Sequence, residues 1–258
     1  EIVLVTGVQT CALPICRLDT HSGSNDTERG PLLLGVKMAA VDYKVWILCI
    51  IIITKTSAGA VTSFIPTLVG TLEYSSVNTL LLVAPPYVFA TVVALAVSYN
   101  SDRTEERSFH IIVPIFFGMI GFIIAASTLN FTARYISLFL MLAGVYGSYN
   151  VALAWISSTL PRPMEKRAAA IAMVNTIGNM AQIYSPYLYP KSNGPQYLTA
   201  MITNAFFCLA CVVATILLRF CLARENSKLA ALEVDAHLTL QAAERSEEHT
   251  SELQSPVL

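Results

Sequence analysis

The stretch VWILCIIIITKTSAGAVTSFIPTLVG, residues Val45–Gly70, decides the fold class of this chain. It opens with an unbroken apolar run and carries a single charged residue, Lys55. Because about 20 predominantly apolar residues suffice for a helix to cross the hydrocarbon core of a bilayer, the stretch predicts a transmembrane helix. A lysine near its middle is costly in lipid and needs protein or water around it.

Five more stretches have a similar length and composition. They are Val77–Ser98, His110–Thr128, Ile136–Leu160, Ala168–Pro190 and Leu198–Cys221. Hydrophobic residues make up 55% of the chain and charged residues 13%, against about 25% charged in soluble proteins. The sequence therefore predicts an all-α membrane protein with six transmembrane helices between residues 45 and 221. A net charge of -1 offers no basic surface for nucleic acid.

The two ends differ from the rest of the chain. VTGVQTCALPI (Val5–Ile15) and RSEEHTSELQSP (Arg245–Pro256) resemble the two-direction translation of one sequencing-library adaptor, because codons exist that make one the reverse complement of the other. The flanks of the spans are therefore expected to be adaptor-derived residues 1–16, a cytosolic linker over 17–44 with a short surface helix at Val36–Tyr43, a helical cytosolic tail over 222–244, and adaptor-derived residues 245–258.

Basic residues in the loops between the predicted spans lie mostly on one side of the membrane. That side holds Arg103, Arg107, Arg162, Lys166, Arg167, Arg219, Arg224 and Lys228, and the other side holds Arg134 and Lys191. Since Lys and Arg concentrate in cytoplasmic loops, we expect both termini in the cytosol. The chain is thus predicted to be a multi-pass integral membrane protein, with the plasma membrane as its expected location.

The loop after the second predicted span reads SYNSDRTEER and begins at Ser98. It resembles the G-x-x-x-D-R/K-x-G-R-R/K signature of the major facilitator superfamily, with Ser98 and Glu105 in place of the two glycines. A carboxylate at a helix end facing arginines can form a charge latch in one transport state and release it in another. The candidate gating residues here are Asp102, Arg103 and Arg107. A solvated charge run that only fixes topology is the alternative.

Five longer strings are similar to the fungal allantoate permease branch of the anion:cation symporters. They are GVKMAAVDYKVWIL (Gly35–Leu48), SFIPTLVGTLEY (Ser63–Tyr74), APPYVFA (Ala84–Ala90), LAWISSTLPRPMEKRAAAIA (Leu153–Ala172) and LRFCLARENSKL (Leu218–Leu229). The resemblance implies the C-terminal half of a twelve-span carrier that moves a proton with a small organic anion, such as a ureide, a vitamin carboxylate or an amino-acid derivative. It implies the lipid bilayer and a missing N-terminal six-helix half as partners, and no cofactor.

Two adjacent prolines, Pro85 and Pro86, fall inside the second predicted span. Each proline removes a backbone donor and clashes with the preceding turn. Such a break in mid-membrane is tolerated where it faces protein or a water-filled cavity. We therefore expect a break in this helix and a gating role for the pair, with a static kink needed for packing as the alternative.

Polar residues within the spans are the candidates for a substrate cavity. At helical spacing Lys55 shares a face of its span with Gly59 and Thr62, which predicts a polar stripe where Lys55 contacts the substrate. Alternatively, Lys55 extends toward the membrane surface or pairs with a carboxylate of the other half. The candidate substrate-binding residues are Lys55 and Thr62 in the first span, Tyr146 and Asn150 in the fourth, and Asn175, Asn179 and Gln182 in the fifth.

The amides of the fifth span recur at i, i+4 and i+7, so they share one face of a helix. They can bind carboxylate or ureide oxygens, or they can hold helices together in lipid. Tyr149 extends the predicted lining of the fourth span. Aromatic residues near the span ends indicate the membrane interface instead, namely Trp155, Tyr184, Tyr187 and Tyr189. For the three tyrosines, packing between helices is the favoured alternative.

Two other classes of function compete with transport. A channel- or receptor-like six-span module is one, although no outer loop is long enough for a selectivity filter or re-entrant segment. An enzyme is the other, and it would need a cluster of nucleophile, base or metal ligands, whereas the four His are scattered. No catalytic or metal-binding residue is therefore assigned. Cys208 and Cys211 have CxxC spacing but apolar surroundings, which favours a structural role.

Overall fold

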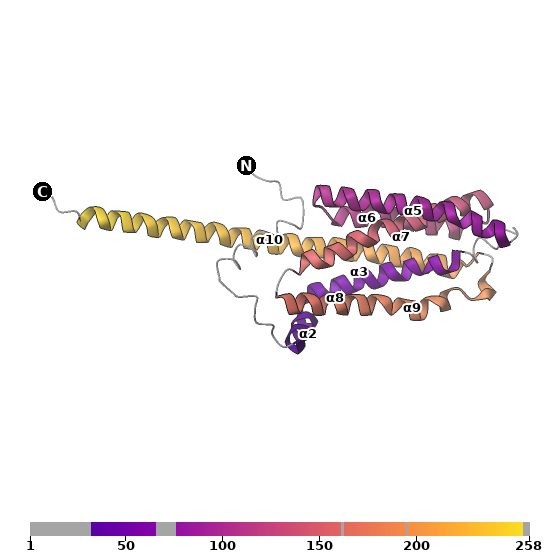
Figure 1. Cartoon of the computed structure of the whole chain (residues 1–258), viewed down its shortest axis with the longest axis horizontal. Helices are drawn as coiled ribbons and strands as arrows, with labels where there is room; N and C mark the ends of the chain where they lie inside the picture. Colours follow the sequence, from indigo (N-terminus) through magenta and orange to yellow (C-terminus); the bar gives the residue numbers. More distant parts are fainter. Residues whose placement is uncertain (1–31, 66–75, 161–162, 195, 255–258) are drawn as a thin grey trace.

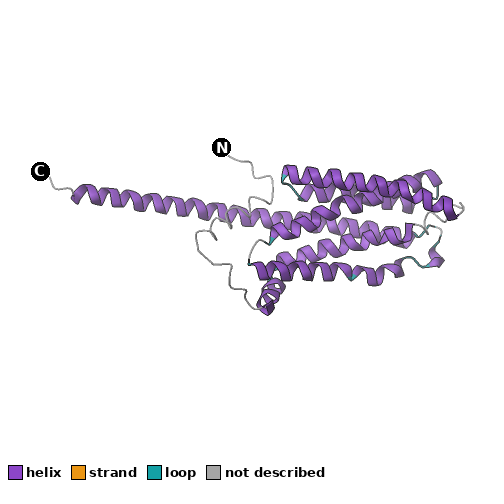
Figure 2. Cartoon of the chain, in the orientation of Figure 1, coloured by secondary structure: helices purple, strands orange, loops and turns teal. Residues whose placement is uncertain are grey.

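The computed structural model of this protein describes residues 32–65, 76–160, 163–194 and 196–254. Within these ranges every regular element is a helix (Figure 2). The helices are α2 (Leu32–Val41), α3 (Tyr43–Gly59), η2 (Ala60–Phe64), α5 (Ser76–Thr104), α6 (Ser108–Ser127), α7 (Phe131–Thr159), α8 (Met164–Asn179), α9 (Ala181–Tyr184), η3 (Ser185–Leu188), η4 (Lys191–Asn193) and α10 (Leu198–Gln254). The expected all-α class is confirmed.

The long helices lie side by side in one bundle, and α2 crosses them at one end (Figure 1). We call this end, where α3 and α8 begin, the α2 end. Helix α10 runs through the bundle toward the α2 end and continues well beyond it. It covers the expected tail and extends to Gln254, inside the segment expected to be adaptor-derived. Residues 1–16 and most of the expected linker lie outside the described part of the chain.

Five of the described helical stretches are long and apolar enough to cross a membrane. They are Tyr43–Phe64, Leu81–Thr104, Ser108–Ser127, Phe131–Thr159 and Leu198–Leu232. The fifth predicted span, Ala168–Pro190, is instead divided into the consecutive pieces α8, α9 and η3, which follow α3 along the bundle (Figure 1). Together these pieces have a length of about 37 Å at 1.5 Å per residue, which exceeds the roughly 30 Å of the hydrocarbon core.

Both ends of the α8–η3 segment differ from a long apolar helix, in addition to its interruption at Met180. Its first turn, Met164–Arg167, is charged, and such side chains favour the aqueous side of a membrane. Near its other end, Pro186 has no backbone N–H with which to continue the α-helical pattern, and the chain tightens into a 3-10 helix there. Apolar length alone does not reveal this division.

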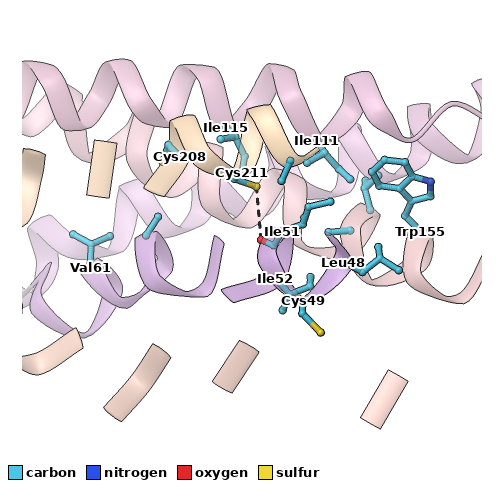
Figure 3. Packing of buried hydrophobic residues seen from close by; sticks show 14 of the residues in the cluster. Leu48, Cys49, Ile51, Ile52, Val61, Ile111, Ile115, Trp155, Cys208 and Cys211 are labelled. Carbon is cyan, nitrogen blue, oxygen red and sulfur yellow. Dashed lines mark hydrogen bonds between the residues drawn. The ribbon is translucent and has the colours of Figure 1, made fainter. Parts of the chain in front are cut away.

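Apolar side chains from α3, α6, α7 and α10 meet in the core. Figure 3 shows Ile51 of α3 close to Ile111 of α6 and Cys211 of α10. The Cys211 thiol donates to the Ile51 carbonyl at 3.8 Å. Trp155 of α7 is fully buried in this core, so the expectation of an interfacial tryptophan is wrong. Since α7 crosses the bundle interior at this point, Trp155 packs against protein.

Helices α6 and α7 approach each other through glycines. A Cβ added to Gly144 of α7 would lie 2.6 Å from both the Gly118 Cα and the Pro114 carbonyl oxygen of α6. Small residues at such a crossing allow helix backbones to come close in lipid. At Gly147 the nearest atom to an added Cβ would be 3.4 Å away, so the two helices have separated there to ordinary contact distance.

The expected break at Pro85 and Pro86 does not occur, because α5 continues through both residues. Pro86 removes the N–H that would otherwise bond to the Leu82 carbonyl four residues earlier. The Tyr135 hydroxyl of α7 donates to that carbonyl instead, at 3.1 Å. A side chain of the neighbouring helix thus replaces the lost backbone donor, and the helix stays intact.

Candidate functional site

The Lys55 ammonium lies deep in the bundle, with only 1% of the residue exposed. It donates to the Val145 carbonyl of α7 at 3.1 Å and to the Ser148 hydroxyl of the same helix. The Tyr149 ring lies beside it, with its centroid 5.7 Å from Nζ. The cation of α3 is therefore held by two consecutive turns of α7 rather than by a carboxylate.

Local structure positions the residues around this lysine. Asp42 accepts a hydrogen bond from the Lys44 backbone N–H at 2.9 Å, and this N-cap starts α3. At the other end α3 tightens into the 3-10 helix η2, which carries Thr62. The Tyr87 hydroxyl of α5 donates to the Thr62 carbonyl at 3.2 Å. Both ends of the segment that carries Lys55 are thus fixed.

A pocket of about 180 Å³ opens beside Lys55, between α3 with η2 on one side, α7 on another, and α8 with α9 on a third. Its lining residues are Lys55, Thr56, Gly59, Thr62, Val145, Tyr146, Tyr149, Asn179 and Gln182. Of these, Lys55 carries the single charge. The pocket combines one cation, an aromatic wall and two amides, which suits a small anion with polar substituents.

Most of the predicted substrate-binding residues meet in this pocket, namely Lys55, Thr62, Tyr146, Asn179 and Gln182. Two of them do not line it. Asn150 is about 100° further around α7 than Tyr149 and is exposed outside the pocket. Asn175 lies one turn nearer the α2 end, where its carbonyl accepts from the Asn179 side chain at 2.9 Å.

Sequence reasoning missed three residues of the site, Thr56, Val145 and Ser148. Val145 takes part through its backbone carbonyl, which no side-chain pattern can indicate. Ser148 is completely buried and lies 93 residues from its partner Lys55. The available signal was its spacing, since Val145, Ser148 and Tyr149 stand at i, i+3 and i+4 on one helical face.

The predicted charge latch is looser than expected. Arg107 lies 4.0 Å from Asp102, whose side chain is 73% exposed, and Arg103 is exposed as well. The shorter contact from this loop joins Glu106 to Arg219 of α10 at 2.7 Å. Glu105, which stands where the signature has glycine, has φ 57. The backbone thus keeps the left-handed conformation for which glycine is suited.

Further ion pairs tie helix ends together at the α2 end. Lys166 of α8 binds Asp42 at 2.7 Å, and Lys44 of α3 binds Glu225 of α10 at 2.7 Å. Burial disfavours the charged carboxylate of Asp42, but hydrogen bonds from Lys166 and from the Lys44 N–H outweigh that effect and lower the pKa of Asp42. Asp42 therefore links the starts of α3 and α8 as an anion.

In the described ranges no three His, Cys, Asp or Glu side chains gather as a metal site requires.

Comparison with known proteins agrees with this architecture. The sequence profile of the Major Facilitator Superfamily matches residues 3–186. The MFS-type transporter cnsO of Penicillium expansum is 31% identical over 176 residues, which cover 66% of this chain and 34% of that protein. The MFS-type transporter efuF of Hormonema carpetanum is 29% identical over 192 residues, which cover 72% and 38%. The major facilitator-type transporter hxnP of Emericella nidulans is 28% identical over 169 residues, which cover 64% and 34%.

The chain spans less than half the length of these curated relatives. No solved structure matches it significantly. The profile match covers most of the chain, and its helices are long and apolar enough to cross a membrane. This chain is an integral membrane protein that belongs to the Major Facilitator Superfamily.

Proposed function

We propose that this chain forms the C-terminal half of a secondary active transporter that carries a small organic anion together with a proton. A second six-helix half, supplied by the rest of the protein, completes the substrate pathway. We refer to the two halves together as the complete carrier. The observation that carries the proposal is the buried Lys55 ammonium beside a pocket with no other charged lining residue.

The pocket chemistry favours an anion. At an effective dielectric near 20, a carboxylate about 4 Å from an ammonium gains roughly 4 kcal/mol. Asn179 of α8 and Gln182 of α9 line the same pocket as Lys55, and their amides can bind further polar groups of the substrate. The resemblance to allantoate permeases supports the same substrate classes, which are ureides, vitamin carboxylates and amino-acid derivatives.

The α2 end supplies the gating elements of the proposal. We assign this end to the cytosol, together with both termini of the chain, and place the carrier in the plasma membrane. Asp102, Arg103 and Arg107 then form a charge cluster at a cytosolic helix junction, where contacts with the second half can change during the cycle. Away from the α2 end, Pro85 and Pro86 act as the flexible point of α5, since the Leu82 carbonyl is bonded there by the Tyr135 side chain and not by a backbone donor of its own helix.

Uptake measurements test the proposal. Cells that express the complete carrier should accumulate radiolabelled allantoate, nicotinate or N-acetylglycine, chosen as one member of each substrate class. Uptake should rise when the outside is acidified and fall when a protonophore collapses the proton gradient. Absence of uptake above vector-only cells for all three acids, or an ion current that follows voltage without saturating in substrate, would contradict the proposal and favour a receptor- or channel-like module.

A further inference from the structure

Ser148 of α7 is completely buried and links two polar groups. Its hydroxyl accepts from the Lys55 ammonium and donates to the Gly144 carbonyl at 2.8 Å. Lys55, Ser148 and Gly144 thus form a chain of hydrogen bonds that ties the cation of α3 to the backbone of α7. The hydroxyl has both its donor and an acceptor position in use.

The hydrogen bonds of the ammonium determine what it can offer a ligand. An ammonium has three N–H donors. The Val145 carbonyl and the Ser148 hydroxyl take two of them, and the Tyr149 ring lies beside the group. One N–H is left for a ligand in the pocket, which suits a single oxygen of a carboxylate.

Fixing this lysine in advance strengthens binding. Lysine carries its charge on a flexible four-carbon stem, and ordering such a side chain during binding weakens affinity. Because Ser148 and Val145 hold the Lys55 ammonium before any ligand arrives, that ordering cost falls on the folding of the protein rather than on the binding of the anion.

We infer that Ser148 is a positioning residue for anion binding, which holds the Lys55 ammonium so that one N–H remains for a carboxylate oxygen. The inference rests on the proposed function, in which Lys55 contacts the transported anion. Ser148 itself does not line the pocket, so it acts through Lys55.

Ser148→Ala in the complete carrier tests this role. Using whichever of labelled allantoate, nicotinate and N-acetylglycine is taken up, the half-saturation concentration should rise about two- to tenfold, as expected when one side chain must be ordered on binding. The maximal rate per surface molecule should stay within about twofold, because the translocating helices are unchanged. If Ser148→Ala changed the maximal uptake rate or the surface expression but left the half-saturation concentration unchanged, Ser148 would have a purely structural role and the inference would be overturned.

Ser137→Ala is the matched control. Ser137 is also a completely buried serine of α7, but its hydroxyl donates to the Arg134 carbonyl of its own helix at 2.6 Å, and it does not line the pocket. This variant should keep the wild-type half-saturation. If Ser148→Ala fails to reach the surface, Ser148→Cys takes its place, since a thiol keeps a similar shape but is a weak acceptor, and the same outcomes apply.

Lys55→Gln distinguishes a failure of the proposed anion site from a failure of the positioning role of Ser148. If this variant transports with wild-type half-saturation, the proposed anion site is wrong. If Lys55→Gln weakens uptake while Ser148→Ala and Ser148→Cys leave half-saturation unchanged, the anion site stands and the positioning role of Ser148 is wrong.

Discussion

The Tyr135 hydroxyl of α7 donates to the Leu82 carbonyl of α5 at 3.1 Å, and Leu82 is the residue whose carbonyl Pro86 deprives of its intrahelical donor. In lipid no water is available to bond such a carbonyl, so a neighbouring helix must do so. This contact explains how α5 continues through two prolines, and it joins the N-terminal part of α5 to the start of α7, toward the end of the bundle opposite α2.

Tyr135→Phe should therefore destabilise the carrier by about 1–2 kcal/mol, the cost of leaving a buried polar group without a partner. Pro86→Ala restores the N–H that bonds to Leu82, so Tyr135→Phe should cost much less in that background. Thermal unfolding of the purified complete carrier in detergent measures both effects. Tyr99→Phe, at an exposed position of α5, is the control. If Tyr135→Phe destabilised the carrier equally in the wild-type and the Pro86→Ala backgrounds, the Tyr135 hydroxyl would not be replacing the donor that Pro86 removes.

Gly144→Ala should destabilise the α6–α7 crossing by about 1–3 kcal/mol, because the added methyl would meet backbone atoms that cannot turn aside. Gly147→Ala is the matched control, since its methyl would meet neighbours at ordinary contact distance. The measurement is the unfolding midpoint of the purified carrier for each variant. Similar midpoints for the two variants would show that the close approach at Gly144 does not limit packing.

Asp42→Asn tests the link between α3 and α8. Asparagine is also a good N-cap, so the change mainly removes the ion pair with Lys166. The lowered pKa of Asp42 means that the pair stabilises the folded state above the ordinary carboxyl value of 3.8 and that this contribution is lost as pH falls through the lowered value. The variant should be less stable than wild type at pH 7, and the difference should shrink below about pH 3.8.

Protease-resistant mass or unfolding midpoint, measured across this pH range, provides the readout for Asp42→Asn. Asp102→Asn is the control, because Asp102 is largely exposed and 4.0 Å from Arg107. A difference between wild type and Asp42→Asn that is unchanged at pH 3 would show that the ion pair does not contribute.

The sequence predicted the bundle well because membrane helices are specified by local apolar length. Five of the expected spans are continuous helices. The fifth expected span is interrupted at Met180, between α8 and α9, and tightens into η3 at Ser185–Leu188, where Pro186 has no backbone N–H to donate. The pocket was predicted in part, since Lys55, Thr62, Asn179 and Gln182 follow helical spacing. Ser148 was not predicted, because its role depends on a contact with α3 that only the packing of α7 determines.

The proposed topology can be checked with introduced cysteines. Arg103→Cys and Met164→Cys lie at exposed positions near the α2 end, and Thr132→Cys is exposed at the far end. With the α2 end in the cytosol, an impermeant thiol reagent added to intact cells should label only Thr132→Cys. Labelling of the first two positions from outside, without permeabilisation, would invert the assignment.

The most direct test of the central claim is uptake per surface-expressed molecule for Lys55→Gln in the complete carrier. Removing the one charge that lines the pocket should raise the half-saturation concentration for the transported acid at least about tenfold, since a buried charge-assisted contact is worth roughly 1.5–3 kcal/mol, while surface expression stays near wild type. Lys55→Arg should keep part of the binding. Reduced surface expression with normal uptake by the molecules that reach the surface would instead make Lys55 a structural residue and contradict the account.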